Sequence, residues 1–173
     1  GPDGYPRMHW DIVGPRYFAT VGTAIVAGRD FDERDGAGSS GVIAINEEAS
    51  RRFFAGVDPI GQTLVWGEGD GQQGLTIVAV TRDVKSNGPR DEPQMRFYLP
   101  YFQMPAIRPN WILASNRFVV RTAANPAGLA PALRQLIQTE DPRLSIESID
   151  IGTDLVSRTL VQERMVAMLL VAF

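Results

Sequence analysis

Three aspartates near residue 30 come closer than any other group in this sequence to the spacing of a cation-binding loop. Asp30, Asp32 and Asp35 supply carboxylate oxygens at short intervals. A calcium loop needs oxygen ligands at its first, third and fifth positions, glycine at its sixth and glutamate at its twelfth. Counted from Asp30, the fifth position is Arg34, the sixth is another aspartate and the twelfth is Gly41. Because three positions fail, we interpret this segment as a solvated acidic loop and assign no metal ligand to it.

A glycine-rich run offers the next candidate, a phosphate cradle. Gly67, Gly69 and Gly71 alternate with other residues, two of which are Glu68 and Asp70. A phosphate-binding glycine loop leads into the N-terminus of a helix, where backbone N–H groups meet the anion. This run leads into a predicted strand, and its two carboxylates repel phosphate. We therefore interpret it as a hairpin loop and assign no cofactor-binding residue.

The nucleophiles and proton-transfer groups form no recognisable catalytic set. His9 is the only histidine, and the chain has no cysteine. Ser39 and Ser40 lie in a glycine-rich stretch outside any G-x-S-x-G elbow. Glu47 and Glu48 are adjacent, so on a helix their side chains diverge and do not face one substrate. The sequence therefore predicts no catalytic, cofactor-binding or metal site, and a chain that is not an enzyme.

The length, composition and charge of the chain indicate the size of its fold and the kind of partner it can bind. The chain has 173 residues, of which 44% are hydrophobic and 21% charged, which is the balance of a globular protein with one domain or two small subdomains. A net charge of -3 does not suit a surface that follows phosphates, so we expect no nucleic-acid partner. Gly1–Arg7 lacks the apolar core of a signal peptide. The protein is then either cytosolic or exported by a signal upstream of this sequence.

Hydrophobic patterning predicts short strands and a few helices in mixed order, which favours an α+β fold over a doubly wound parallel sheet. The clearest feature is a hairpin whose two strands flank the glycine-rich run. Asn46 is a good N-cap, and proline follows a capping residue at Asn125. Strands are predicted at residues 9–13, 42–45, 63–66, 75–80, 94–99, 118–121 and 144–149, and residues 24–27 form a short apolar segment. Helices are predicted at 16–21 after Pro15, after Asn46 as far as Gly56, at 126–140 and from Thr153 onward.

The C-terminal residues lack the polar stripe of a surface helix. Met165–Phe173 has no polar side chain, and Gln162, Glu163 and Arg164 precede it as a charged collar. A membrane span needs about 20 apolar residues, and the sequence shows nine. Two interpretations remain, a buried core helix that ends the domain and the first turns of a membrane span.

Taken in order, short motifs along nearly the whole chain resemble those of the MacB-like periplasmic core domain, found in permeases of the MacB/FtsX class of ABC transporters. Each motif is common by itself, whereas their order and spacing are fairly specific. The matching stretches are Tyr17-Phe18, Gly28-Arg29-Asp30-Phe31, Val42-Ile43-Ala44-Ile45-Asn46-Glu47, Arg52-Phe53-Phe54, Asp58-Pro59-Ile60-Gly61, Ile77-Val78-Ala79-Val80, Asp83-Val84, Tyr98-Leu99-Pro100-Tyr101, Val119-Val120-Arg121-Thr122, Asp141-Pro142 and Gln162-Glu163-Arg164.

This resemblance implies a particular domain plan. Such domains lie between the first and second membrane helices and combine a porter-like β-α-β subdomain with an inserted β-rich subdomain. By this likeness, residues 1–29 and 116–160 form the porter-like part, residues 30–115 the insertion, and residues 161–173 the start of a membrane helix. The family's porter begins with a further strand and helix, so the likeness also implies a porter that is incomplete at the N-terminus.

The resemblance implies a role as well. The domain would lie on the extracytoplasmic, periplasmic side of the bacterial cytoplasmic membrane and transmit conformational change driven by a separate cytoplasmic ATPase subunit. Its implied partners are the membrane helices of the same permease, a second permease copy in a homodimer, and a membrane fusion or other periplasmic protein. The transported substrate is not readable from the sequence.

A second interpretation is a soluble periplasmic module that binds a ligand or a partner protein. Trp66, Phe102 and Trp111 are its candidate contacts, although each aromatic is also explained by packing in a core or a loop. An apolar run continuing beyond Phe173 would favour the permease domain, and a polar turn there would favour the binding module.

Overall fold

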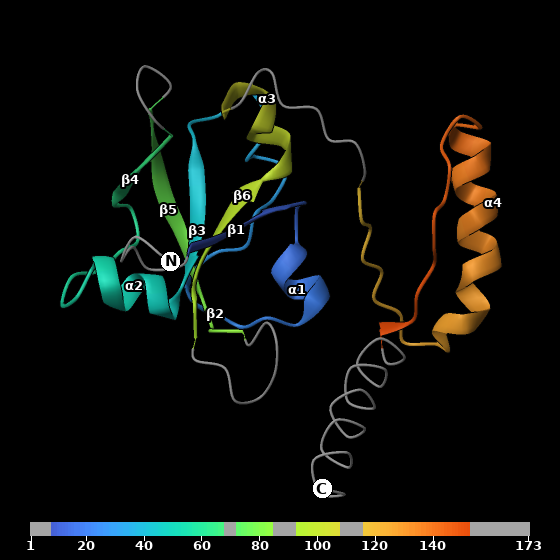
Figure 1. The fold of residues 1–173 in the computed structure, drawn as a ribbon, viewed down its shortest axis with the longest axis horizontal. Helices are drawn as coiled ribbons and strands as arrows, with labels where there is room; N and C mark the ends of the chain where they lie inside the picture. Colours follow the sequence, from blue (N-terminus) through green and yellow to red (C-terminus); the bar gives the residue numbers. More distant parts are fainter. Residues whose placement is uncertain (1–7, 68–71, 85–92, 108–115, 153–173) are drawn as a thin grey trace, which may run out of the picture. The chain divides into compact units, whose positions relative to one another are not determined.

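The structure is a computed structural model, and it falls into two compact units, Gly1–Arg121 and Thr122–Phe173, which are described separately. Figure 1 shows the strands of the first unit between helices, and the helix α4 (Ala130–Glu140) of the second. The residues that the structure describes are 8–67, 72–84, 93–107 and 116–152.

A mixed six-stranded sheet forms the centre of the first unit. The strand order is β1-β6-β3-β5-β2, and β4 also pairs with β5. β1 is parallel to β6 and β3 is parallel to β5, whereas the other pairs are antiparallel. The strands are β1 (Met8–Val13), β2 (Ile25–Gly28), β3 (Val42–Asn46), β4 (Thr63–Trp66), β5 (Gln73–Thr81) and β6 (Met95–Pro100).

β5 is the longest of the described strands and pairs with three others. β3 follows one of its edges, while β4 pairs with its first half and β2 with its last residues on the other edge. Gly28 at the end of β2 has a φ of 79°, and a Cβ atom there would lie 2.1 Å from the backbone oxygen of Val78. Only glycine therefore permits this close approach of β2 to β5.

Both faces of the sheet are covered, which explains why β3 is a continuous apolar run: all five of its residues are buried. On one face, Ile43, Ile45 and Phe97 pack beneath α2 (Glu47–Phe53) and α3 (Met104–Ile107). On the other, Phe18 of α1 (Tyr17–Val21) packs edge-on against Tyr98 with ring centroids 4.8 Å apart. Figure 1 shows α1 and α2 on opposite sides of the strands.

The helix ends follow local chemistry. The Asn46 side chain accepts a hydrogen bond from the backbone N–H of Ala49 (3.1 Å), so the predicted cap of α2 is confirmed. Gly22, with φ 81°, follows the last residue of α1 as its C-cap. Pro15 is not the first residue of that helix. Arg16 is the N-cap residue directly before α1 and has a left-handed conformation, with φ 58°. The backbone N–H of Arg16 donates to the carbonyl of Phe31 (2.8 Å).

In the second unit, a 3-10 turn η3 (Pro126–Leu129) runs into α4 (Ala130–Glu140). Asn125 accepts from the N–H of Ala127 (3.0 Å), and Asp141 ends α4, as the sequence predicts. No residue of α4 is buried.

Two predicted strands are wrong, since residues 118–121 and 144–149 are coil. Alternating polarity gives a strand only where a neighbouring strand accepts its backbone hydrogen bonds. In the part of the chain that the structure describes, neither segment has such a neighbour.

The α+β class and the other predicted strands are confirmed. The division into residues 1–29 with 116–160, residues 30–115 and residues 161–173 stays a prediction. β1 and β2 share one sheet with the four later strands, and the boundary between the two compact units lies at residues 121–122.

Candidate functional site

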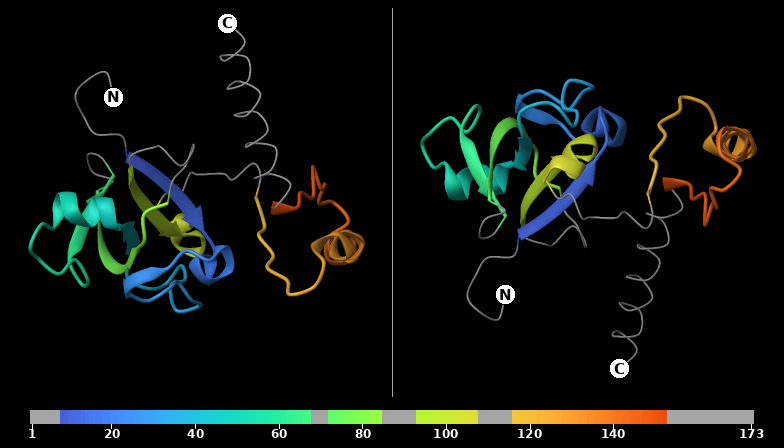
Figure 2. Two further views of the ribbon diagram at one scale, coloured as in Figure 1. Left: turned by 90° about the horizontal axis from the view of Figure 1, so that it is seen from below. Right: turned by 90° about the horizontal axis from the view of Figure 1, so that it is seen from above.

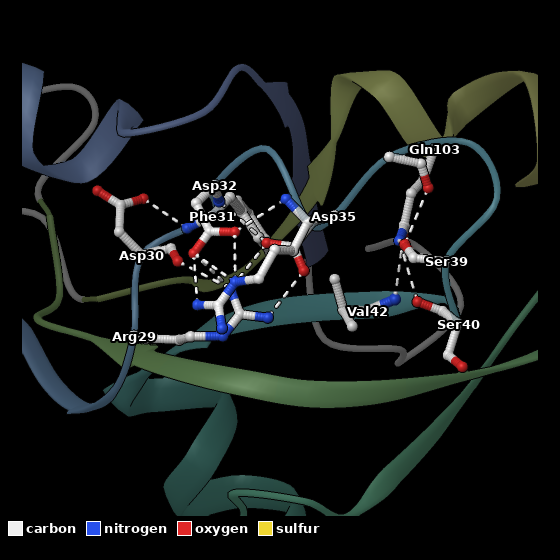
Figure 3. A network of polar contacts seen from close by, with 11 residues as sticks. Arg29, Asp30, Phe31, Asp32, Asp35, Ser39, Ser40, Val42 and Gln103 are labelled. Carbon is white, nitrogen blue, oxygen red and sulfur yellow. Dashed lines mark hydrogen bonds and ion pairs between the residues drawn. The ribbon is translucent and has the colours of Figure 1, made fainter.

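The loop between β2 and β3 is closed by a bidentate ion pair. The two terminal nitrogens of Arg29 donate to the two carboxylate oxygens of Asp35, each at 2.8 Å (Figure 3). The backbone N–H of Asp32 also donates to Asp35 (3.0 Å). Asp35 is 4% exposed. The expectation of a solvated acidic loop is therefore wrong for this residue, because its carboxylate turns inward to a cation from the end of β2.

This pair stays charged over the ordinary pH range. Burial alone would raise the pKa of Asp35, but the hydrogen bonds from Arg29 and from the N–H of Asp32, with the charge of Arg29, outweigh it and lower the pKa. The hydrogen bond to Asp35 raises the pKa of Arg29. The pair therefore acts as a permanent clamp at the base of the loop.

The other two aspartates make their shortest contacts elsewhere, although Asp32 also lies 3.7 Å from Arg29. Asp30 accepts from the N–H of Ala19 in α1 (3.0 Å) and from the N–H of Phe31 (2.8 Å). Asp32 pairs with Arg34 at the surface (2.7 Å). The three carboxylates do not converge on one point, and the described residues contain no group of three or more histidine, cysteine or acidic side chains that could hold a metal ion.

Gln103 fastens the other end of the same loop. It is 2% exposed and lies in the 3-10 turn η2 (Tyr101–Gln103) after β6. Its Oε1 accepts from the N–H of Val42 (3.0 Å), and its Nε2 donates to the Ser39 hydroxyl (2.6 Å) and the Ser40 carbonyl (3.0 Å) (Figure 3). Sequence reasoning missed this residue, because its partners are about 60 residues earlier in the chain. Ser39 and Ser40 therefore connect the loop to Gln103 by hydrogen bonds in this structure.

Asn46 is the centre of a second network, at the junction of β3 and α2. Its Oδ1 accepts from the N–H groups of Ala49 (3.1 Å) and Arg96 (2.9 Å). Its Nδ2 donates to Asp83 (2.7 Å) and to the carbonyl of Gln94 (2.8 Å). The side chain is 1% exposed and makes all four hydrogen bonds that an asparagine offers.

Asp83, just beyond β5, ties the same junction to α2. Its Oδ1 also accepts from the N–H of Glu48 (2.9 Å), and its Oδ2 accepts from Arg51 (2.7 Å), which in turn contacts Glu48 (2.8 Å). The Glu47 carboxylate accepts from the N–H of Asp83 (3.2 Å). Glu47 and Glu48, whose side chains are predicted to diverge, therefore both belong to the network that joins α2 to the end of β5.

Aromatic side chains form an apolar surface on the α2 side of the sheet. Trp10 of β1 lies opposite Phe97 of β6 in the strand register, and its ring meets Trp66 of β4 edge-on with centroids 6.1 Å apart. Phe53 of α2 lies 6.2 Å from Phe97, centroid to centroid. Trp10 is 43% and Phe53 51% exposed.

Two of the three aromatics predicted as ligand contacts are described by the structure, and they have different neighbours. Trp66 is half-buried against the core and Trp10, while Phe102 contacts Tyr101 (5.3 Å). Trp111 lies outside the described residues. A surface hollow of 320 Å³ is lined by neither Trp66 nor Phe102; its described lining residues are Pro15, Arg16, Asp32, Glu33 and Arg34.

The remaining sequence candidates are His9, the glycine-rich run and the apolar C-terminal residues. His9 is exposed on β1. Gly67 follows β4 with φ 100°, whereas Gly69 and Gly71 lie outside the described residues, as does Met165–Phe173. Where the structure describes the chain, no helix has the length and apolar character needed to cross a bilayer.

Two solved structures are similar to this chain. The chain aligns with the periplasmic region of MacB from Actinobacillus actinomycetemcomitans with a TM-score of 0.57 and 19% identity, covering 85% of this chain and 62% of that one. A domain of a putative permease from Porphyromonas gingivalis aligns with a TM-score of 0.49 and 23% identity, over 79% of this chain and 60% of that one. The first alignment shows the fold.

The sequence defines the family. The MacB-like periplasmic core domain matches residues 5–139, and the chain belongs to that family. A curated relative, the macrolide export ATP-binding/permease protein MacB 1/2 of Paracoccus denitrificans (strain Pd 1222), is 29% identical over 94 residues, which are 54% of this chain. The match spans only 13% of the relative's length. The resemblance inferred from the motifs is thus confirmed at the level of family and fold.

Proposed function

We propose that this chain is the extracytoplasmic domain of an ABC transporter permease and transmits conformational change, driven by a separate cytoplasmic ATPase, to the export or release of a substrate. The family match across residues 5–139 carries this proposal. The domain would lie at the bacterial cytoplasmic membrane, on the periplasmic side, and would itself be non-catalytic.

The first unit has the construction that force transmission requires. The Arg29–Asp35 clamp, the Gln103 fastener and the Asn46–Asp83 network each join segments far apart in the sequence. Buried, fully hydrogen-bonded polar groups rigidify a fold, because each partner lost leaves an expensive unpaired group. A unit joined in this way moves as one body when its attachment to the membrane moves.

The proposed partners follow from the same role. They are the membrane helices of the same permease, the cytoplasmic ATPase subunit, a second permease copy, and a membrane fusion or other periplasmic protein. The alternative, a soluble ligand-binding module, has less support: Trp66 packs against the core, and the surface hollow is lined mainly by charged side chains.

Residues 153–173, which lie outside the described residues, would supply the link to the membrane. A short Gly-Ser insertion near Arg158 in the complete permease should leave ATP hydrolysis intact and uncouple it from transport. The same insertion after Gly56 is the matched control, because this exposed glycine has open space around it. Transport that stays coupled to hydrolysis in the Arg158 variant would rule out transmission through this link.

A further inference from the structure

Arg121 is the residue at which the first unit ends and the chain continues into the second unit. Residues 116–121 are coil, and Phe118 within them is 83% exposed. Going back along the chain, the nearest described residue that is buried is Ile107. Burial therefore does not hold the described coil in place where the chain leaves the first unit.

The side chain of Arg121 is seated on the C-terminal end of α1. Its Nε donates a hydrogen bond to the backbone carbonyl of Thr20 at 2.6 Å. Thr20 lies in the last turn of α1, where carbonyls have no N–H partner further along the helix. Arginine side chains are suitable donors to such carbonyls. The contact thus joins the end of the coil to a backbone group of α1.

Gly22, the C-cap of α1, leaves the space beside which the guanidinium lies. A Cβ atom on Gly22 would be 2.6 Å from one terminal nitrogen of Arg121. Gly22 also has φ 81°, so glycine serves both the turn that ends the helix and the close approach of the arginine. Gly56 has nearly the same φ, 79°, but open space where its Cβ would be. The close approach is therefore particular to Gly22 and does not follow from a positive φ.

α1 is itself fixed to the sheet. Phe18 is fully buried and packs on Tyr98 of β6 with ring centroids 4.8 Å apart. The N–H of Ala19 donates to Asp30, just beyond β2 (3.0 Å). Figure 2 shows α1, the blue helix, beside the strands of the first unit in both views. A displacement of Arg121 is therefore passed to the sheet through a helix that is packed against it.

We propose that Arg121 is a coupling residue, whose contact with α1 fixes the point where the chain leaves the first unit. Movement of the attached part of the permease then moves the sheet and is not taken up by the exposed coil of residues 116–121. This role rests on the proposed function, because it names the residue through which transmission enters the first unit. Arg121 acts by position and takes part in no chemistry.

The test measures the position of the first unit in the complete permease. Spin labels on Val65→Cys, in a permease without other cysteines, give the distance between the two copies with and without trapped ATP. Arg121→Ala should reduce the nucleotide-dependent shift in this distance to about a third or less, a loss of the size found when residues that couple two sites are replaced. ATP hydrolysis should persist. Arg117→Ala, in the same exposed coil, is the matched control and should keep the full shift.

Two glycine variants separate the contact from backbone strain. Gly22→Ala places a methyl group against the guanidinium of Arg121 and should reduce the shift as Arg121→Ala does. Gly56→Ala imposes the same strain of a positive φ where there is open space, and it should leave the shift unchanged. Circular dichroism and urea unfolding of the 173-residue chain check that each variant folds.

The outcomes distinguish this role from the proposed function. If the permease that carries Val65→Cys alone shows no nucleotide-dependent shift, the proposed function fails and the role of Arg121 fails with it. If that permease shows the shift and Arg121→Ala retains it in full, only the coupling role of Arg121 is overturned. Equal effects of Gly22→Ala and Gly56→Ala would also overturn it, because strain and not the contact would then be the cause.

Discussion

At the residue scale, the structure depends on a few polar side chains that are buried and fully paired. Asn46 illustrates what sequence reasoning reaches and where it stops. Its capping role is local, within three residues, so the pattern after β3 predicts it. Its bonds to Asp83 and Gln94 cross 37 and 48 positions of sequence and depend on strand order, which no local pattern encodes. The same reason hides the inward turn of Asp35.

The Arg29–Asp35 clamp predicts a measurable loss of stability. Asp35→Asn replaces a buried bidentate ion pair by a neutral contact, while Arg29, 38% exposed, can still reach water. We expect the free energy of unfolding to fall by about 1–2 kcal/mol in urea denaturation. Arg34→Ala, which breaks the surface pair with Asp32, should leave the free energy of unfolding nearly unchanged, because exposed ion pairs contribute little. Equal effects of the two variants would contradict the clamp.

The clamp also predicts a pH dependence. Because folding lowers the pKa of Asp35, its stabilisation is complete above the unfolded pKa of about 3.9 and is lost as the pH falls through the folded value. The difference in urea midpoint between the native chain and Asp35→Asn should be constant near neutrality and shrink below about pH 4. A difference that persists undiminished in acid would show that Asp35 acts without its charge.

At the scale of elements, hydrophobic runs predicted the central strands well. β3, β5 and β6 consist mainly of apolar residues, and most of these residues are buried in the structure. The failures at residues 118–121 and 144–149 have one cause: each has a strand-like pattern but no described neighbouring strand. Loop architecture was missed for a related reason, since the Gln103 fastener joins η2 to the residues before β3.

Gln103→Ala tests whether that fastener positions the loop. The substitution leaves the buried N–H of Val42 without its acceptor, and we expect a loss of about 2–3 kcal/mol in thermal or urea unfolding. The adjacent Phe102→Ala is the matched control, because Phe102 is 52% exposed, and it should cost about 1 kcal/mol or less. If Gln103→Ala were as mild as its neighbour, the hydrogen bonds of Gln103 would contribute little to the fold.

At the scale of the whole molecule, the two units differ in what holds them. Every buried apolar side chain of the described residues lies between Val13 and Ile107, within the first unit. α4 has eleven residues and none of them is buried, and isolated helices of that length are marginal in water. The second unit therefore has no described core of its own.

This difference predicts how fragments behave. Residues 1–121 should unfold cooperatively with nearly the midpoint of the full chain, whereas residues 122–152 should show little helix by circular dichroism. Cooperative folding of the short fragment, or a disordered long one, would contradict the assignment of the core to the first unit.

The central claim is that this domain changes position with the state of the ATPase, and the most direct measurement is a nucleotide-dependent distance. Val65→Cys gives one labelling position within this cysteine-free chain, on β4 and 61% exposed. In the complete permease without other cysteines, electron paramagnetic resonance would measure the distance between spin labels on the two copies. The account predicts a distribution that shifts between the nucleotide-free and ATP-trapped states, and identical distributions in both states would contradict it.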